Sequence, residues 1–306
     1  MDLEAEQPGC RRRLQTRLIR DVGARSEMPG WETEMKYVRP PRGCTPGDGN
    51  PFSPDGKYGP EWTGLALGDG NPFVGTSESG LFHYQFDRND PNVAAIVADF
   101  IRYENEHGRA PMLFFPEDID VDAWVAHALS VTPLPHVIRD TDPEYLVHST
   151  SVEAGRQILR DRELKSFSRL CREGSSPSWH HLRSDSLGEP SDYARHINFG
   201  PIDSPWVESV AASHADGRFL TPDDPYVPGY RFYVHGHKII EAGLDVRVAG
   251  AVKVRDRLPL DPHLAAAISI QDADPHREAA RWTPRMFTQE ANNVFAGMLD
   301  KTGEGS

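Results

Sequence analysis

The chain of 306 residues is long enough to bury one large core or two smaller ones, and a hydrophobic fraction of 38% fits a globular protein. The formal net charge of −13 argues against nonspecific nucleic-acid binding, which needs a cationic surface to displace counterions from phosphate. No stretch approaches about 18 uninterrupted apolar residues and the N-terminus lacks an apolar leader, so we expect neither a membrane span nor a secretory signal.

The three cysteines, Cys10, Cys44 and Cys171, are scattered along the chain and odd in number. This pattern argues against a disulfide framework and against a zinc site built on cysteine thiolates. It suits a reducing compartment, so we expect a soluble cytoplasmic protein.

Residues 1–80 have the composition of a loop-rich N-terminal region, with many prolines and glycines. Arg11–Arg20 contains five arginines, which we interpret as a solvated tail because the surrounding sequence is polar. The hexapeptide Gly-Asp-Gly-Asn-Pro-Phe occurs at Gly47–Phe52 and again at Gly68–Phe73. Its residues favour turns, and neither copy supplies the closing glutamate of a calcium-binding loop.

Residues 81–140 show the pattern of an α/β segment. Aromatic and polar residues alternate over Phe82–Phe86, which predicts a strand. Asp90-Pro91 then predicts the start of a helix, since aspartate caps and proline favours the first turn. A buried strand is expected at the apolar run Met112–Phe115, and a second helix over Val121–Leu129.

The next stretch places three polar residues at a junction between two elements. Tyr145–Val147 predicts a short strand that ends at His148, and Ser151 is a favourable N-cap for a helix that follows at once. His148, Ser149 and Thr150 therefore lie where a strand ends and a helix begins. Backbone N–H groups lack helical partners at such a junction, and anionic or amide-bearing ligands often bind there.

The remaining chain contains a long polar loop and several regular elements. The loop covers Phe167–Asp192, and long loops in compact enzymes are often lids or binding loops. The other predicted elements are an extended run at Arg195–Gly200, helices at Trp206–Ser213 and Pro284–Lys301, a helical turn at His237–Ala242, and strands at Tyr230–Gly236, Leu244–Val248 and Ala251–Val254.

The His-Ser-Thr strand end at 148–150, the helix after it and the exit Glu163-Leu164-Lys165 resemble the opening motif of the ADP-ribosyltransferase superfamily. The chain is most similar to the branch of NAD-dependent RNA 2′-phosphotransferases. Later matches follow in the order of that branch: Arg195–Phe199, Tyr230–His235, Ile239–Gly243, Leu244–Val248, and Ala251–Val254 before Leu258-Pro259. The resemblance extends over Tyr145–Leu260, a little over a third of the chain.

This resemblance implies a split mixed β-sheet of ADP-ribosyltransferase type, with NAD as a substrate and nicotinamide as a product. It implies that His148, Ser149 and Thr150 bind the nicotinamide ribose and the carboxamide. Cleavage of the N-glycosidic bond builds positive charge on the ribose. The site therefore needs hydrogen-bonding groups for the ribose hydroxyls and cations for the pyrophosphate.

Further candidates lie near the second predicted strand. Arg195 and His196 join His148 as candidate catalytic residues, and at most one of them lines a cleft, because successive strand residues point to opposite faces. A cation such as Arg195 can face phosphate, and an aromatic ring can stack on nicotinamide or adenine. The additional candidate NAD-binding residues are Tyr193, Asn198 and Arg218.

The sequence also departs from the family pattern. Residues 1–140 contain no clear copy of the Arg-His pair of the family's RNA-binding lobe. The family arginine after the second strand falls near Ser213-His214, where Arg218 is the nearest cation, and the toxin-type Glu-x-Glu motif is missing from the equivalent region. The acceptor of ADP-ribose therefore stays open between an RNA phosphate, a protein side chain and a small molecule.

Two alternative functions remain. His235 and His237 are two positions apart, so in a strand they share a face and could bind a metal together with His148 or His196, as in a metal-dependent hydrolase. We prefer a site without metal, because isolated histidine pairs are more often hydrogen-bonded structural residues. The second alternative is a non-catalytic binding module that retains the fold.

We therefore expect an α+β protein with four regions. These are a loop-rich region at 1–80, an α/β segment at 81–140, an ADP-ribosyltransferase-like core at 141–262, and a C-terminal helical extension at 263–306.

Overall fold

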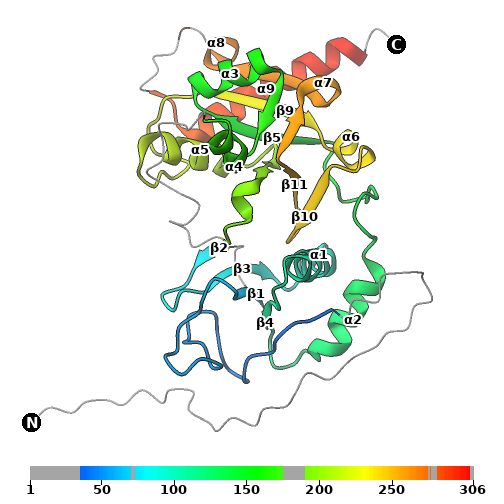
Figure 1. The fold of residues 1–306 in the computed structure, drawn as a ribbon. Helices are drawn as coiled ribbons and strands as arrows, with labels where there is room; N and C mark the ends of the chain where they lie inside the picture. Colours follow the sequence, from blue (N-terminus) through cyan, green and yellow to red (C-terminus); the bar gives the residue numbers. More distant parts are fainter. Residues whose placement is uncertain (1–34, 70–72, 175–189, 275, 277–280, 304–306) are drawn as a thin grey trace, which may run out of the picture. The chain divides into compact units, whose positions relative to one another are not determined.

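The computed structural model describes residues 35–69, 73–174, 190–274, 276 and 281–303. The chain separates into two compact units, Met1–Thr132 and Pro133–Ser306 (Figure 1). Both contain helices and strands, so the expected α+β class is confirmed. The arginine-rich segment, most of the second Gly-Asp-Gly-Asn-Pro-Phe copy and residues 175–189 of the predicted loop lie outside the described residues.

The first unit is built on a four-stranded sheet with strand order β2-β3-β1-β4. Its elements are β1 (Thr63–Gly68), β2 (Phe73–Thr76), β3 (Phe82–Asp87), α1 (Val93–Glu106), β4 (Met112–Phe114) and α2 (Val121–Val131). The strand β1 runs parallel to both β3 and β4, and β2 is antiparallel to β3. The strands and helices predicted between residues 81 and 131 are present as β3, α1, β4 and α2.

The prediction that residues 1–80 are irregular was wrong for two strands, β1 and β2. The sequence of β1 has no alternation because it is the inner strand of a parallel set, where residues on both faces are buried. Leu65, Ala66 and Leu67 are all buried. The described copy of the repeated hexapeptide, Gly47–Phe52, forms turns as expected.

The second unit contains a four-stranded sheet with strand order β13-β9-β5-β8, and two smaller sheets, β10-β11-β7 and β12-β6. The strands are β5 (Tyr145–Thr150), β6 (Glu163–Lys165), β7 (His196–Asn198), β8 (Gly200–Pro201), β9 (Tyr230–His235), β10 (Asp245–Val248), β11 (Ala251–Arg255), β12 (Arg257–Pro259) and β13 (Leu264–Ser269). β7 and β8 belong to different sheets although only Phe199 separates them.

All strand pairs among the described residues of the second unit are antiparallel, so the expected mixed sheet was wrong in this respect. The register shows the reason: Thr150 at the end of β5 pairs with Tyr230 at the start of β9. The connecting segment returns to the end of β5 at which it left, and β9 then runs back along its neighbour.

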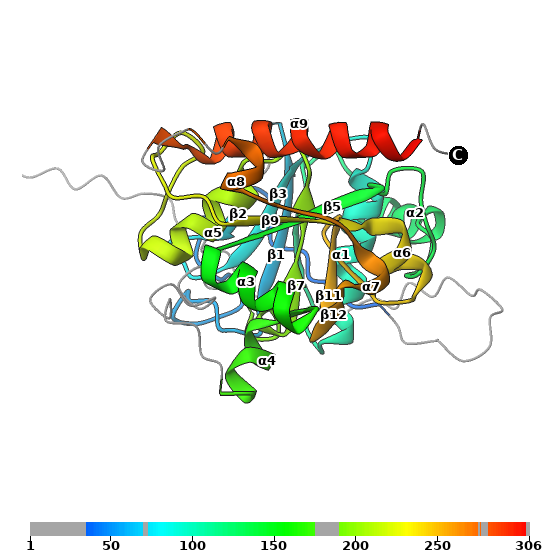
Figure 2. The same cartoon turned by 90° about the horizontal axis from the view of Figure 1, so that it is seen from above.

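Helices cover the sheets of the second unit. They are α3 (Val152–Asp161), α4 (Phe167–Arg172), the 3₁₀ helix η2 (Tyr193–Arg195), α5 (Trp206–Asp216), α6 (Gly236–Glu241), α7 (Leu260–His263), α8 (Ile270–Ala273) and α9 (Pro284–Gly303). Figure 2 shows α9 as a long helix along one side of this unit. Its buried stripe includes Phe287, Ala291 and Phe295, as the helical spacing predicts.

The strand β5 separates two apolar cores. Val147 packs in a cluster with Tyr233, Trp282 and residues of α9. Leu146, its neighbour, packs in another cluster with Ile197 of β7 and residues of β11 and β12. Alternate residues of β5 therefore face different layers, which decides where each predicted site residue points.

The region 263–306 is not a purely helical extension, because β13 lies within it. Its sequence Leu-Ala-Ala-Ala-Ile-Ser is rich in alanine, which favours helices. Pairing with β9 outweighs that preference, and Ile268 is fully buried in the α9-side core.

Candidate functional site

The predicted His-Ser-Thr junction lies where β5 ends against β9. His148 pairs with Phe232, Ser149 with Arg231, and Thr150 with Tyr230. The helix α3 follows directly, and the Ser151 hydroxyl accepts a hydrogen bond from the Ala154 backbone N–H at 3.3 Å, as expected of an N-cap. The strand-to-helix junction predicted from sequence is therefore confirmed.

Ser149 faces the α5 side of β5, inside a buried polar cluster. Its hydroxyl donates to Oε1 of Glu208. Nη1 of Arg231 lies 2.8 Å from the same oxygen, and Nη2 donates to the carbonyl oxygen of Ile202 at 2.6 Å. Tyr226 donates to Oε2 of Glu208 at 3.2 Å, and burial together with this carboxylate raises the pKa of the Tyr226 phenol.

This cluster of Ser149, Glu208, Tyr226 and Arg231, called the buried ionic cluster below, is closed to solvent. The side chain of Arg231 has no exposed surface and that of Glu208 is 2% exposed. Both carboxylate oxygens of Glu208 accept hydrogen bonds from other residues of the cluster. Ser149 is therefore a structural residue of the strand in this arrangement, and the expectation that it binds nicotinamide receives no support from its position.

His148 faces the opposite side of β5. Its ring is half-buried and lies edge-on against Phe199, with ring centroids 6.0 Å apart. Nδ1 lies 3.0 Å from the backbone oxygen of Asn198 in β7. Burial lowers the pKa of His148 below its ordinary value, partly offset by the hydrogen bond to the Asn198 carbonyl.

The bond to Asn198 also fixes the tautomer of His148. A carbonyl oxygen only accepts, so Nδ1 carries the proton in the neutral ring and Nε2 is left as an acceptor. Among the described residues, none bonds Nε2. Thr150, two positions along, is half-buried and lies on the same face as His148.

The second predicted segment is present as η2 and β7. His196 is buried at 5% exposure, whereas Arg195 and the side chain of Asn198 are exposed. Asn198 pairs with Lys253 and His196 with Arg255 of β11, so these four residues share one face of the small sheet. The exposed guanidinium of Arg195 makes no ion pair within the described part of the chain.

Two other candidates lie in unexpected surroundings. Tyr193 is only 2% exposed, and Nζ of Lys253 lies 3.9 Å from its ring centroid. Its ring is therefore covered by a cation–π contact and presents no open face to a nicotinamide or adenine. Arg218 follows the C-terminus of α5, is 58% exposed and pairs with Asp216 at 3.4 Å.

The histidine-based metal site would need His235 and His237 on one strand face. In the structure β9 ends at His235, and His237 lies in α6 with Nε2 3.2 Å from the backbone oxygen of Asp142. The His235 ring packs against Tyr145, and burial lowers its pKa. Within the described ranges, no group of three or more His, Cys, Asp or Glu residues is arranged to hold a metal ion.

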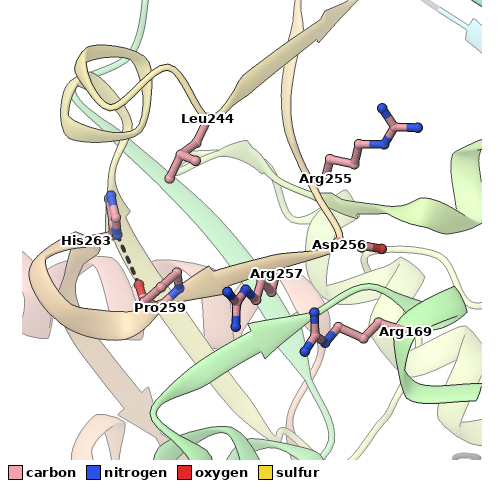
Figure 3. A pocket seen from close by; sticks show the side chains of 7 residues that line it. All are labelled: Arg169, Leu244, Arg255, Asp256, Arg257, Pro259 and His263. Carbon is pink, nitrogen blue, oxygen red and sulfur yellow. Dashed lines mark hydrogen bonds between the residues drawn. The ribbon is translucent and has the colours of Figure 1, made fainter. Parts of the chain in front are cut away.

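An arginine-lined cavity of about 630 Å³, called the arginine cavity below, was not predicted from the sequence (Figure 3). Arg169 of α4, Arg257 of β12 and His263 of α7 line it, together with Leu244, Arg255, Asp256 and Pro259. These residues are dispersed over about ninety positions. The available signal was the charged run Arg255-Asp256-Arg257, which directly follows a predicted strand.

No family model matches this chain, and neither a curated protein nor a solved structure is significantly similar to it. No helix among the described residues is both long and apolar enough to span a bilayer.

Proposed function

We propose that the second unit is an NAD-dependent transferase that moves ADP-ribose from NAD to an acceptor, with His148 in the NAD site. The observation that carries the proposal is the hydrogen bond from His148 of β5 to the Asn198 backbone of β7. The hypothesis requires the histidine at one strand end and a second strand about fifty positions later to border one site. The 3.0 Å contact supports the proposal because it brings these two segments together.

The arrangement of the sheets gives further support to an ADP-ribosyltransferase-type fold. The chain passes from β7 to β8 across Phe199 and thereby from one sheet to another. β8 pairs with β5, and β7 pairs with β11. The sheet is thus divided between β5 and β7, as expected for a split sheet, and His148 lies at this division.

The properties of His148 suit a ribose-binding group. A neutral ring with Nε2 as acceptor can take a hydrogen bond from a ribose hydroxyl, which is a donor. Oxocarbenium character develops on the ribose as the C1′–N bond breaks, and a neutral acceptor avoids placing a positive charge next to it. Burial favours this neutral form of His148.

The reaction would proceed by substitution at C1′ of the nicotinamide ribose. The bond from C1′ to the pyridinium nitrogen breaks and neutral nicotinamide leaves with the electron pair. An oxygen of the acceptor forms the new bond to C1′ and loses its proton to solvent or a basic side chain. Arg195 is the exposed cation nearest in sequence to β7, and we assign it to a phosphate of NAD or of the acceptor.

The acceptor remains one of three classes: an RNA phosphate, a protein side chain or a small molecule. The net charge of −13 disfavours acceptors that are held only by nonspecific contacts to a nucleic-acid backbone. We therefore expect an acceptor that is recognised by specific contacts.

The test combines calorimetric titration of NAD with an assay for nicotinamide release. We expect His148→Ala to weaken NAD binding by about tenfold or more while the protein stays folded, since it removes the hydrogen-bonding group from the site. His235→Ala is the matched control, because His235 is also half-buried at a strand end and also has a lowered pKa. Equal NAD affinity in wild type and His148→Ala would remove the assignment.

A further inference from the structure

The arginine cavity brings together cationic groups whose hydrogen-bonding capacity is only partly used. Within the described residues, the Arg169 side chain is bonded through Nε alone, which lies 2.7 Å from Oε1 of Glu173. Nη1 of Arg257 lies 3.6 Å from Oε1 of Glu163, beyond hydrogen-bonding distance. Both Nη groups of Arg169 and the guanidinium of Arg257 can therefore donate to a ligand.

Asp256, the acidic residue that lines the cavity, forms an ion pair with an arginine that does not line it. Oδ1 of Asp256 lies 2.8 Å from Nη2 of Arg172, and Arg172 is not among the lining residues. Arg169 and Arg257 have acidic neighbours outside the lining as well, Glu173 and Glu163, and Arg255 is a third lining cation whose side chain extends away from Arg257 in Figure 3. Arg255 makes no ion pair with the described residues.

The opposite end of the cavity adds a histidine and an apolar wall. His263 is buried, and its Nδ1 lies 3.0 Å from the backbone oxygen of Pro259 (Figure 3). Leu244 and Pro259 supply the apolar surface. A volume of about 630 Å³ is in the range of sites that hold small organic ligands.

We propose that the arginine cavity binds the phosphate group of a small phosphorylated molecule. Guanidinium groups donate parallel N–H bonds that match the oxygens of a phosphate, and two such groups from separate elements line this one cavity. Nucleic acid is the less favoured ligand, because a chain with a net charge of −13 repels a polyanionic backbone outside the cavity.

The two proposals rest on different residues, since none of His148, Asn198 and Arg195 lines the cavity, although the Asp256 N–H donates to the Arg195 carbonyl oxygen at 2.9 Å. A failure of one assignment therefore leaves the other standing. The variants that test the cavity are expected to leave NAD titrations unchanged, and His148→Ala is expected to leave phosphate titrations unchanged.

The test is a titration of the full chain with inorganic phosphate and with phenyl phosphate, followed by calorimetry. We expect wild type to bind phenyl phosphate with a Kd of about 1 mM or tighter. The double variant Arg169→Gln, Arg257→Gln should weaken binding by about tenfold or more, because it removes charge-assisted hydrogen bonds. Arg39→Gln is the matched control, because Arg39 is an exposed arginine of the first unit that does not line the cavity and forms an ion pair with Asp122 at 3.2 Å.

The outcomes separate the sources of phosphate. Tighter binding of phenyl phosphate than of inorganic phosphate assigns the site to an organic phosphate that also uses Leu244 and Pro259. Equal binding assigns it to the free anion. Absence of binding at about 10 mM of both ligands overturns the proposal. So does equal binding by wild type and the double variant, or preference for a short single-stranded RNA over phenyl phosphate.

Discussion

The polar residues on the two faces of β5 differ in burial and in the number of their hydrogen-bond partners. On one face Ser149 belongs to the buried ionic cluster, in which Glu208 and Arg231 are closed to solvent and bonded within the protein. On the other face His148 is half-buried, has one backbone partner and keeps an acceptor nitrogen. Adjacent residues of one sequence motif thus have different roles, and the number of internal partners distinguishes the structural residue from the one that can bind a ligand.

The largest expected effect comes from breaking the buried ionic cluster. Arg231→Met leaves the Glu208 carboxylate buried without its cation, which should cost about 3–5 kcal/mol of unfolding free energy. Chemical denaturation measures this loss. Arg285→Met is the control, because Arg285 makes a similar ion pair with Asp223 at the surface and should change stability little. A comparably small loss for Arg231→Met would mean that the cluster does not stabilise β5.

A second large effect is expected where β5 meets β9. A Cβ atom on Gly229 would lie 1.8 Å from the backbone oxygen of Thr150 and 2.8 Å from Cα of Ser151. Gly229→Ala should therefore displace the strand-to-helix junction, at a cost of about 3 kcal/mol, the upper end of the usual range for overpacking.

The control for Gly229→Ala is a second glycine substitution, which should raise the unfolding free energy instead of lowering it. Gly297 lies within α9, and a Cβ atom there would have open space around it, so Gly297→Ala should raise the unfolding free energy by about 0.5–1 kcal/mol. Thermal or chemical denaturation of both variants gives the comparison. Equal stability of Gly229→Ala and wild type would show that the junction is not tightly packed.

The fold could be predicted where the signal is local. The strand β5, its N-cap Ser151, the strand β9 and the helix α9 follow from capping residues and periodic apolar positions. The strands β1 and β13 were missed because their assignment depends on neighbours. β1 is buried on both faces and shows no alternation, and β13 has a helix-favouring sequence that only pairing with β9 converts into a strand.

The candidate site could be predicted only in part. The proximity of His148 to the second segment follows from the order of the motifs, and the contact with Asn198 is present. The burial of Tyr193 could not be inferred, because it depends on Lys253 from a distant strand. The arginine cavity requires α4 and β12 to meet, and no local pattern encodes such a contact between distant segments.

Substitutions of Ser149 and His148, which are neighbours on β5, should have smaller effects on stability that differ between the two residues. Ser149→Ala removes one hydrogen bond to a buried carboxylate and should cost about 1–2 kcal/mol of unfolding free energy. His148→Gln should be less destabilising, since its partner is one backbone carbonyl and the ring is half-buried. The order should reverse for NAD binding, which only the His148 variant weakens. Denaturation and NAD calorimetry on the same two proteins would detect any other order.

The smallest expected effect is a dependence of stability on pH that comes from His148. Its pKa is lowered in the folded protein, so the unfolded chain takes up a proton first as the pH falls below the ordinary value of about 6.5. The stability contributed by the neutral ring is present above pH 6.5 and is lost as the pH falls from that value to the folded pKa.

His235 has a lowered pKa as well, so only the difference between wild type and His148→Gln isolates the contribution of His148. We expect wild type to lose more stability than His148→Gln as the pH falls below about 6.5, and NAD affinity to decrease at lower pH, where the folded ring takes up a proton and Nε2 no longer accepts a hydrogen bond. If the unfolding free energies of the two proteins changed equally with pH, the pKa of His148 would not be lowered by folding. The proposed difference between the two faces of β5 would then be wrong.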